Sequence, residues 1–410
     1  MKPRVAILLE SSLEVSRRIL SGIVSFMDRH EPWIVDFIPG ALCEQRLPDQ
    51  WRGDGIIARI PSPKEAERLA YNPAPKVIFD PLDEYTQPSH PLSRWPRIEC
   101  DNVECGAAAA RHLVRQGFSN FAYVDATPSS APGMTTDCSW PRLANWRHLR
   151  ERGFADALKK RGFAYTAYPN PSRNDESYNA NIERPRLVRF LKSLPKPVAV
   201  FCPNDARGRQ VTDACLYADI PVPYQVGVIG VNDDATICNF SQPPLSSIPL
   251  DAETAGRKAA AALAALMRGR QNVDSYRYRP LAPVTRISTL NLQTNDQLVI
   301  SVLEKIHSHK GFNMRATEIA EDCSISLRHL EKKFRAELGR SLGDVIRTTC
   351  MENVLGLVNG TDMPFKDIAA KAGHRSVSHL SGAFRERFGI TMTEARSKAA
   401  LMGHGRIHPR

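Results

Sequence analysis

The chain has 410 residues, which is too long for one ordinary domain and suggests about two to four. Its composition, 42% hydrophobic and 24% charged, is that of a globular protein and excludes a disordered or fibrous chain. The longest apolar run, Ala259–Met267, is far shorter than the roughly 20 residues that a membrane-spanning helix needs. No signal-peptide pattern precedes the first strand-like run, so we expect a cytoplasmic protein without a membrane partner.

Positive charge is concentrated near the C-terminus. The formal net charge is +11, of which the last 115 residues carry +5 and the first 295 carry +6. This density favours a polyanion as partner of the C-terminal part. The nine cysteines show no zinc-binding spacing, and the closest pair, Cys100 and Cys105, lacks a second pair. We therefore expect reduced thiols, with no metal and no cofactor.

Residues 4–286 alternate short apolar runs with amphipathic patterns. The runs that predict strands are Val5–Leu9, Gly55–Ile60, Lys76–Phe79, Phe121–Val124, Ala199–Cys202 and Val226–Val231. Helices are predicted at Val15–Arg29, Val103–Gln116, Leu149–Arg161, Asp205–Ala218 and Ala252–Arg268. This alternation predicts an α/β fold of parallel sheets with helices on both faces. The strands are too many for one small sheet, so we expect two lobes.

Polar side chains follow four of these predicted strands. They are Glu10, Ser11, Asp125, Asn204, Asp205, Asn232 and Asp233. Because ligands of open parallel sheets bind outside the carboxyl ends of the strands, these residues are candidate effector contacts. Their oxygens and amides suit paired hydrogen bonds with neighbouring hydroxyls, which favours a small polyol over a nucleotide.

Arg150 and Trp146 complete the candidate effector site. Arg150 presents five donors in a fixed fork, and Trp146 presents a flat face on which a sugar ring can stack. Asp and Asn at strand ends equally often cap helices, and Trp146 equally suits core packing. No phosphate-binding loop, nucleophile elbow or metalloprotease motif occurs, so we expect no enzyme. If the protein were an enzyme, Asp205 or Glu10 would be the best candidate for its catalytic residue.

Beyond residue 297 the periodic segments are helical, and a pattern of two helices joined by a tight turn occurs twice, about fifty residues apart. The first unit joins a helix over Ala316–Glu321 to one that opens after Ser326, a natural N-cap. The second unit joins Phe365–Ala372 to a helix capped by Ser376 or Ser378. Such a second helix can enter the DNA major groove. Two plain helical hairpins are the alternative, which the repetition on a basic domain disfavours.

Residues 326–396 resemble the paired helix-turn-helix domain of AraC-type transcription regulators. The matching positions are Ser326, Leu330, Phe334, Gly339, Ser341, Asp367–Ala369, Gly373, Ser378, Phe384, Arg385, Phe388, Gly389, Thr391 and Arg396. Three positions depart from the family pattern: Met392 stands in place of proline, Ala395 in place of an aromatic residue, and Cys350 in place of arginine.

That resemblance implies the residues that face DNA. In the first unit they are Arg328, Glu331 and Lys332, with Ser326 and Arg335 beside them. In the second unit they are Val377, Ser378, Ser381 and Gly382, with Ser376 and Arg385 beside them. The side chains of the second set are too short to reach far into a DNA groove. We therefore expect the first unit to make most contacts with DNA bases and the second to position the protein on the DNA backbone.

Residues 5–287 resemble the periplasmic-binding-protein-like effector domain of LacI/GalR regulators. The matching segments are Asp101–Asn102, Ala107–Leu113, Gly117–Phe118, Arg150–Phe154, Asn204–Asp205, Ile220–Pro223, Gly227–Gly230 and Leu245–Ile248. Effector lobes followed by an AraC-type domain is the order of the XylR group of xylose-operon regulators, which Trp51–Ala58 and Trp146–Arg150 resemble in detail. The sugar contacts implied by this resemblance include Arg150, Asp205 and Asn232, the last in place of the usual Asp.

The resemblance predicts a sugar-binding effector domain at residues 1–288, a linker at 289–297 and a double helix-turn-helix domain at 298–410. It further implies a homodimer that binds operator DNA, works with RNA polymerase and responds to D-xylose or a similar monosaccharide. We expect an activator of sugar-catabolism genes, in which a ligand between the lobes changes the arrangement of the dimer on DNA. Repression, a sugar-modifying enzyme fused to a helical domain, and a ligand-independent architectural DNA-binding protein are the alternatives.

Overall fold

The structure is a computed structural model that describes residues 2–30, 32–126, 145–169, 180–290, 296–309, 311–361 and 363–402. It divides into two compact units, Met1–Asn291 and Leu292–Arg410. Residues 291–295 of the predicted linker lie outside the described residues. In the described part of the chain no helix has both the length and the apolar character needed to span a membrane.

The first unit contains two parallel sheets. One has the order β11 (Tyr276–Tyr278), β5 (Arg97–Cys100), β4 (Lys76–Phe79), β3 (Gly55–Arg59), β1 (Arg4–Leu8) and β2 (Ile34–Phe37). The other has the order β10 (Ser246–Ile248), β9 (Val226–Val231), β8 (Val198–Phe201), β6 (Asn120–Tyr123) and β7 (Thr166–Ala167). Each sheet is the centre of one lobe, which confirms the predicted two-lobed α/β fold.

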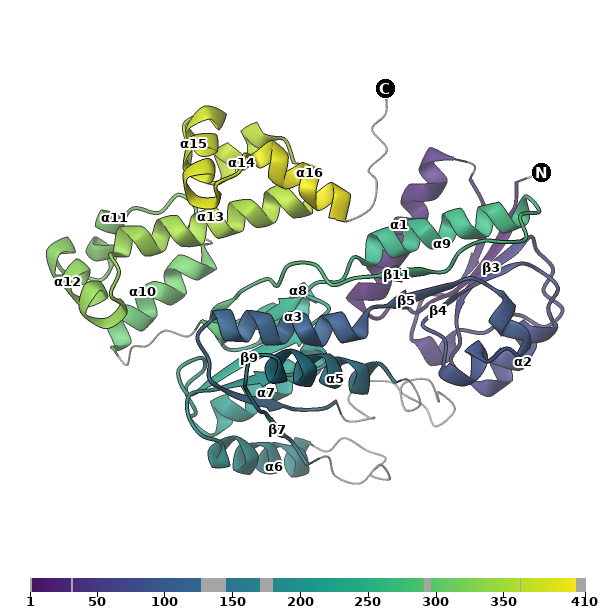
Figure 1. The fold of residues 1–410 in the computed structure, drawn as a ribbon, viewed down its shortest axis with the longest axis horizontal. Helices are drawn as coiled ribbons and strands as arrows, with labels where there is room; N and C mark the ends of the chain where they lie inside the picture. The colour runs from purple at the N-terminus through teal and green to yellow at the C-terminus, as the bar shows by residue number, and fades with distance from the viewer. Residues whose placement is uncertain are drawn as a thin grey trace. The chain divides into compact units, whose positions relative to one another are not determined.

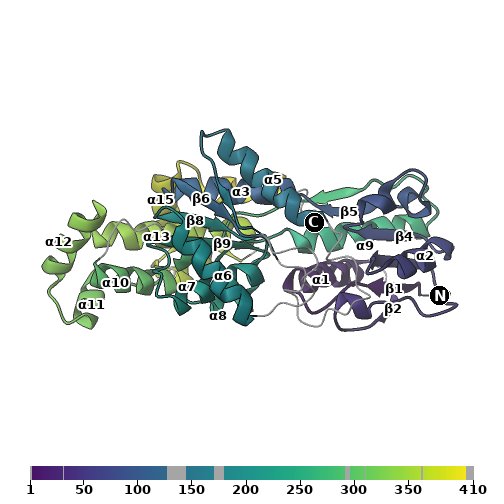
Figure 2. The same ribbon diagram turned by 90° about the horizontal axis from the view of Figure 1, so that it is seen from below.

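Helices cover both faces of each sheet (Figure 1). On the first lobe, α1 (Glu14–Arg29) and α9 (Ala252–Met267) pack on one face and α2 (Pro63–Tyr71) on the other. On the second lobe, α3 (Asn102–Arg115) and α5 (Trp146–Lys159) lie side by side on one face. The opposite face carries α6 (Ala180–Ser193), α7 (Asp205–Tyr217) and α8 (Ala235–Phe240), which Figure 2 shows together.

Strand β1 shows why these strands read as unbroken apolar runs. Val5 and Ile7 point into the core beneath α1 and α9, whereas Ala6 and Leu8 point into the core beneath α2. Because both faces of the sheet are covered, neither set of side chains meets water. The same argument accounts for β3, β4, β8 and β9, all of which the apolar runs predicted.

Four of the five strands that the sequence analysis missed are edge strands. They are β2, β7, β10 and β11, and the fifth is β5. Three of these edge strands are partly exposed and lack a continuous apolar run, and both residues of β7 are exposed. Strand β10 is buried, but it begins with two serines. In β5, the polar Arg97 and Glu99 alternate with buried or half-buried neighbours. Helices α2, α6 and α8 were also missed.

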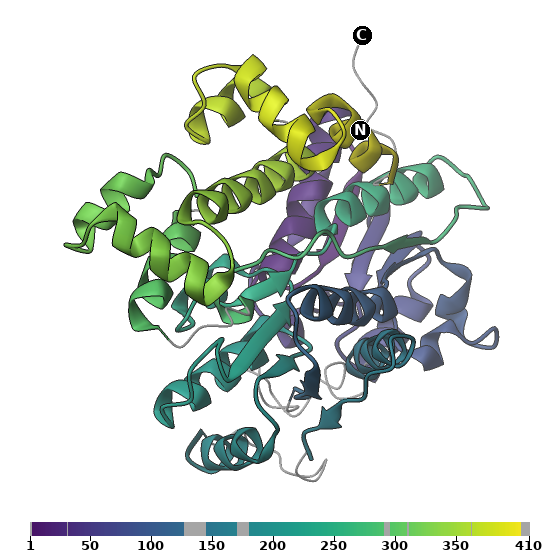
Figure 3. The same cartoon turned by 60° about the vertical axis from the view of Figure 1, so that its left-hand side comes forward.

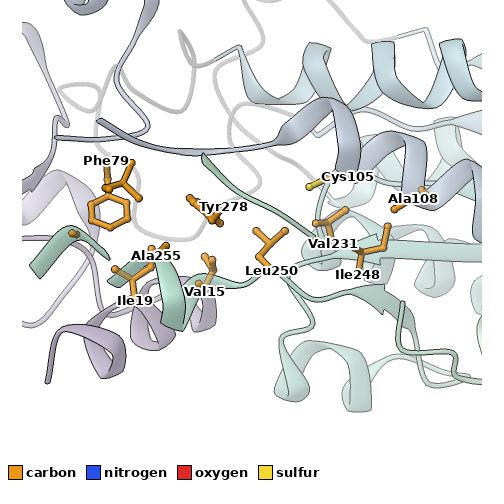
Figure 4. Packing of buried hydrophobic residues seen from close by; sticks show 14 of the residues in the cluster. Val15, Ile19, Phe79, Cys105, Ala108, Val231, Ile248, Leu250, Ala255 and Tyr278 are labelled. Atoms are coloured by element: carbon orange, nitrogen blue, oxygen red, sulfur yellow. The ribbon is translucent and has the colours of Figure 1, made fainter. Parts of the chain in front are cut away.

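The two lobes share one hydrophobic core. The described chain crosses between them after β5, after β10, and again beyond β11, where Val284 bridges to Ser247. Figure 4 shows the core passing from Ile19 and Phe79 through Tyr278 and Leu250 to Val231 and Ile248. Apolar packing therefore surrounds the three places at which the chain crosses between the lobes.

The second unit consists of helices throughout its described residues (Figure 3, green to yellow). They are α10 (Gln297–Ser308), α11 (Ala316–Asp322), α12 (Leu327–Leu338), α13 (Leu342–Gly360), α14 (Phe365–Lys371), α15 (Val377–Phe388) and α16 (Met392–Met402). Two separate cores form, one around Leu330 and Phe334 and the other around Leu380 and Phe384. This arrangement confirms the predicted pair of helix-turn-helix units.

The repeat of fifty residues extends to single side chains. Ser326 caps α12 and Ser376 caps α15, each by accepting a hydrogen bond from the amide three residues on. Each helix ends at a glycine with positive φ, Gly339 at 65° and Gly389 at 71°, a conformation that glycine adopts without strain. Of the two caps proposed for the second unit, Ser376 is therefore the one used.

The departures from the AraC pattern lie in the second core. Met392, Ala395 and Cys350 are all buried there, at 2%, 5% and 6% exposure. The start of α16 is held by Thr391, whose hydroxyl accepts from the Glu394 amide while the Glu394 carboxylate accepts from the Thr391 amide. This reciprocal capping fixes the start of α16 next to Met392.

Helices α1 and α9 approach so closely that Gly256→Ala should destabilise the first unit. A Cβ on Gly256 would lie 2.0 Å from the carbonyl oxygen of Ile19, so the helices would have to separate. We expect a loss of about 1–3 kcal/mol in the free energy of unfolding, measured in urea. Gly356→Ala in α13, where a Cβ meets nothing within 4 Å, is the control and should be neutral or stabilising. Equal behaviour of the two variants would contradict the close packing.

Candidate functional site

A buried charge network lies at the carboxyl ends of β1, β3 and β4. Arg59, the last residue of β3, donates to Glu10 Oε1 at 2.5 Å and to Asp80 Oδ2 at 2.7 Å. Glu10 is 2% exposed and Arg59 4%. Burial by itself lowers the pKa of Arg59, but the two carboxylates outweigh it and hold the pKa above its ordinary value. Arg59 therefore remains charged although it is buried.

Asp80 connects this network to the crossovers. Its Oδ1 accepts a hydrogen bond from the Cys100 amide at 2.9 Å, and its Oδ2 accepts one from the Tyr278 hydroxyl at 3.2 Å. Cys100 and Tyr278 end β5 and β11, the two strands that lead toward the second lobe. Burial raises the pKa of Tyr278 well above its ordinary value, so this hydroxyl remains a donor.

Arg150 and Trp146 lie about one turn apart on α5 and contact each other. Arg150 donates through Nε to Asn102 Oδ1 at 3.0 Å and through Nη1 to the carbonyl of Pro203. Its guanidinium carbon lies 5.0 Å from the centre of the Trp146 ring. Trp146 belongs to the second lobe by sequence yet packs against the core of the first. One face of the indole is thus covered by Arg150.

Among the buried polar atoms that have no hydrogen-bond partner within the described residues, two on expected effector residues are of opposite kinds. They are Glu10 Oε2, an acceptor, and Trp146 Nε1, a donor. Leaving such an atom unsatisfied costs about 1–3 kcal/mol. A group that both donates and accepts could satisfy both kinds of atom.

Asp205 and Asp233 form a second cluster at the carboxyl ends of β8 and β9. Asp205 is 1% exposed and accepts from the Ser247 hydroxyl at 2.5 Å and from the Asp234 amide at 2.8 Å. The Asp233 amide donates to the same Ser247 hydroxyl at 3.0 Å. Burial raises the pKa of Asp205 to about 7, although its two hydrogen bonds act in the opposite direction.

Asp125 lies in a third cluster, at the end of β6. Its Oδ2 accepts from Arg147 Nη1 at 3.2 Å, and its backbone carbonyl accepts from Arg207 Nε at 2.8 Å. Arg207 is fully buried and paired with Glu183 at 2.6 Å. The expected effector residues thus fall in three polar clusters in the described part of the chain, around Arg59, Asp205 and Asp125.

The remaining three expected effector residues have local backbone roles. Ser11 accepts a hydrogen bond from the Gly40 amide at 2.9 Å. Asn204 caps α7 by accepting from the Arg207 amide at 2.8 Å, which is the capping alternative. Asn232 has a φ of 108°, and its amide donates to the Ile248 carbonyl at 2.9 Å. Asn and Asp are the side chains that tolerate such backbone best after glycine.

Several residues of these clusters escaped the sequence analysis. They are Arg59, Asp80, Asn102, Arg147, Ser247, Tyr278 and Arg286. Arg59 had a usable signal, since a lone charge in the apolar run Gly55–Ile60 must be paired when buried. Asp80 follows a predicted strand directly. Tyr278 and Arg286 had none, because their partners lie far away in the sequence.

A pocket of about 600 Å³ lies elsewhere, along β1 and β2. Its lining includes Arg4, Asp36, Trp51 and Arg52, and none of the expected effector residues. Asp36 accepts from Trp51 Nε1 at 2.6 Å and from Arg4 Nε at 2.8 Å. These polar groups already satisfy each other, so we do not assign the effector to this pocket.

The expected DNA-facing residues divide into exposed side chains and side chains with structural roles. Arg328, Lys332 and Arg335 are exposed on α12. Glu331, by contrast, accepts a hydrogen bond from the Leu342 amide at 3.2 Å and so helps to hold the start of α13. Ser326 likewise serves as a helix cap.

On α15, Ser378 and Arg385 are exposed, Ser381 is half buried, and Ser376 serves as the cap. Ser378 occupies the place of Arg328, and Gly382 that of Lys332, in the fifty-residue repeat. The basic face of α12 therefore has no equivalent on α15 apart from Arg385, which repeats Arg335.

Two family models match the chain: a periplasmic binding protein-like domain over residues 110–289 and a helix-turn-helix domain over 319–398. The xylose operon regulatory protein of Haemophilus influenzae is 24% identical over 395 residues, which cover 96% of this chain and 98% of the relative. That of Escherichia coli K12 is 22% identical and covers 96% of each chain. The solved structure of the xylose-binding transcription activator XylR shares the fold, with a TM-score of 0.61 at 22% identity over 97% of this chain and 98% of that one.

The chain is a DNA-binding transcription regulator that joins a periplasmic binding protein-like domain to a helix-turn-helix domain. Its two domain matches fall one in each unit of the structure, and its relatives match both units in the same order. The resemblance to XylR-type regulators, drawn from sequence motifs, is confirmed over nearly the whole chain.

The raised pKa of Asp205 should make the stability of the regulator depend on pH. Between about pH 4 and 7 the folded protein keeps a proton that the unfolded chain has lost, so raising the pH through this range removes stability. Asp205→Asn has no such proton. The wild type should therefore lose stability relative to this variant up to about pH 7 and show a constant difference above it. Urea unfolding across this range is the measurement, and a pH-independent difference would refute the raised pKa.

Arg328→Ala should weaken specific DNA binding more than Ser381→Ala does. Arginine on the exposed face of the first recognition helix can donate to a guanine, and its loss costs about 1–3 kcal/mol. Ser381 is short and half buried. Affinity for a duplex selected in vitro by the wild-type regulator is the measurement, with thermal unfolding to show that both variants fold. Unchanged affinity of Arg328→Ala would overturn the assignment.

Proposed function

We propose that the regulator binds D-xylose or a closely related monosaccharide at the carboxyl ends of the strands in its first unit. The observation that carries this proposal is the unmet acceptor at Glu10 Oε2 together with the unmet donor at Trp146 Nε1. A sugar hydroxyl both donates and accepts, so neighbouring hydroxyls complement such a pair. The names of the two xylose operon regulatory proteins supply the choice of sugar.

The proposed contacts come from both lobes. Glu10 belongs to the first lobe, whereas Arg150, Asp205 and Asn232 belong to the second. Arg150 is anchored on Asn102 and Pro203, so its guanidinium is held in place before any sugar arrives. We further assign weaker or indirect roles to Ser11, Asp125, Trp146, Asn204 and Asp233. In this scheme Asp205 holds its neighbours Ser247 and Asp234 in position.

A sugar held by both lobes favours the arrangement in which both can reach it. The ligand acts only through its different affinity for the two arrangements, typically by about 1–3 kcal/mol of coupling. Arg18 of the first lobe already donates to the Asp233 carbonyl of the second at 3.2 Å, so the two lobes meet beside this site. We propose a homodimer in the cytoplasm, in which this change repositions two DNA-binding units on operator half-sites and activates transcription with RNA polymerase.

We propose no catalytic activity. Glu10 is paired with Arg59, and Asp205 accepts two hydrogen bonds from Ser247 and Asp234. Both carboxylates thus act as fixed acceptors, which suits binding. The matched domains are likewise a binding domain and a DNA-binding domain.

Thermal unfolding of the full-length regulator with D-xylose, other pentoses and common hexoses tests the effector. A ligand at 100 times its Kd adds about 2.7 kcal/mol of stability, which gives a visible rise in Tm. We expect D-xylose or a close relative to give the largest rise. Asn232→Asp should then shift the preference among these sugars, because Asn can donate a hydrogen bond where Asp only accepts. No rise with any sugar would refute the proposed effector.

A further inference from the structure

Asp233 is bonded to three different parts of the first unit. Its carboxylate Oδ1 lies 2.8 Å from Nη2 of Arg286, its carbonyl accepts from Arg18, and its amide donates to Ser247. Arg18 lies on α1 of the first lobe, and Ser247 in turn donates to Asp205. Arg286 begins the stretch with which the first unit ends. Asp233 therefore joins the opposite lobe, the proposed effector site and the end of the unit.

That last stretch, Arg286–Leu290, is here called the exit segment, because the chain continues from it into the DNA-binding unit. Buried hydroxyls hold it. The Ser288 hydroxyl donates to the Val228 carbonyl of β9 at 2.6 Å, and the Thr289 hydroxyl lies 2.7 Å from that of Ser246. All three hydroxyl residues are fully buried. The exit segment thus follows any movement of the second lobe.

Arg286 ties the exit segment to Asp233 as well as to its own surroundings. Its Nη1 donates to the Leu245 carbonyl at 3.0 Å, and its backbone carbonyl accepts from the Ser246 hydroxyl at 2.9 Å. The Arg286 side chain is 18% exposed and that of Asp233 14%. Water screens such a pair less than it screens a surface pair, so breaking it has a larger effect. Among the described residues, the other cation paired with Asp233 is Arg18, whose Nη2 lies 4.0 Å from Oδ2.

We propose that the Asp233–Arg286 ion pair transmits the effector's binding to the DNA-binding unit, with Arg286 as a positioning residue. The proposal rests on the proposed function. A ligand at Asp205 changes the hydrogen bonds of Ser247, and a movement of the lobes changes the Arg18–Asp233 contact. Both changes reach Asp233, whose ion pair holds the first residue of the exit segment. Ligand binding at Asp205 and movement of the lobes therefore both act on the Asp233–Arg286 ion pair.

Arg286→Gln in the full-length chain tests this coupling, with D-xylose as the probe. D-xylose is supplied at a concentration that saturates each variant, and the Kd for a duplex selected in vitro by the wild type, without sugar, should stay close to wild type. The ratio of DNA affinities with and without D-xylose, roughly 5–150-fold in typical allosteric proteins, should fall toward one. Arg286→Lys keeps the charge opposite Asp233 and should restore part of the ratio. A wild-type ratio in Arg286→Gln would overturn the proposal.

Arg257→Gln is the matched control. Arg257 lies on α9 and pairs with Glu253 at 2.7 Å, but this ion pair is much more exposed and far from the exit segment in the sequence. Its loss removes the same charge from the same unit. The ratio of DNA affinities should therefore remain at the wild-type value.

Hydrogen exchange of the ligand-free protein gives a second test that needs no effector. The Ser288 amide donates to the Pro244 carbonyl and the Leu290 amide to the Ile287 carbonyl, both at 3.1 Å. Arg286→Gln should speed exchange at both amides, and Arg257→Gln should not. Unchanged exchange would overturn the ion pair's role whatever the effector is. Faster exchange in a protein that binds no D-xylose would support that role and count against the proposed sugar alone.

Discussion

The first unit depends on the rule that a charge removed from water must be paired. Arg59 is almost fully buried, and it is stable there because Glu10 and Asp80 lie within 2.7 Å. Each of these three residues lies at or just beyond the carboxyl end of a different strand of the same sheet. The pairing therefore fixes the strand ends relative to one another, which is where a ligand of this fold class is bound. The same rule explains the Arg207–Glu183 pair in the second lobe.

The shared core determines how movement in one lobe reaches the other. Tyr278 and Leu250 carry apolar packing through the crossovers, so the lobes are joined by packed side chains as well as by chain connections. Close-packed interiors deform little, and a change at the strand ends is then passed on as a shift of whole elements. In addition to this apolar packing, Asp233 makes polar contacts with Arg18 of the first lobe and with Arg286. These contacts link particular residues, whereas apolar packing does not.

The DNA-binding unit shows how a duplicated motif diverges. Caps, core residues and terminating glycines repeat at a spacing of fifty residues, because each is needed to build the same pair of helices. The exposed faces do not repeat: Arg328 and Lys332 correspond to Ser378 and Gly382. Exposed positions bear no packing constraint, so they are free to differ in what they recognise. Two copies of one fold thus present two different surfaces.

The sequence by itself determined the fold class, the inner strands except β5, the main helices and both helix-turn-helix units, because these depend on local periodicity and caps. It also selected Arg150 and Asp205 as candidate effector contacts, and both are buried in the structure. Tertiary structure alone decided their partners. Arg59 meets Glu10 across 49 residues, and Arg286 meets Asp233 across 53, separations at which no local pattern exists. Edge strands were missed for a related reason, since their pairing comes from a neighbouring strand and not from their own apolar pattern.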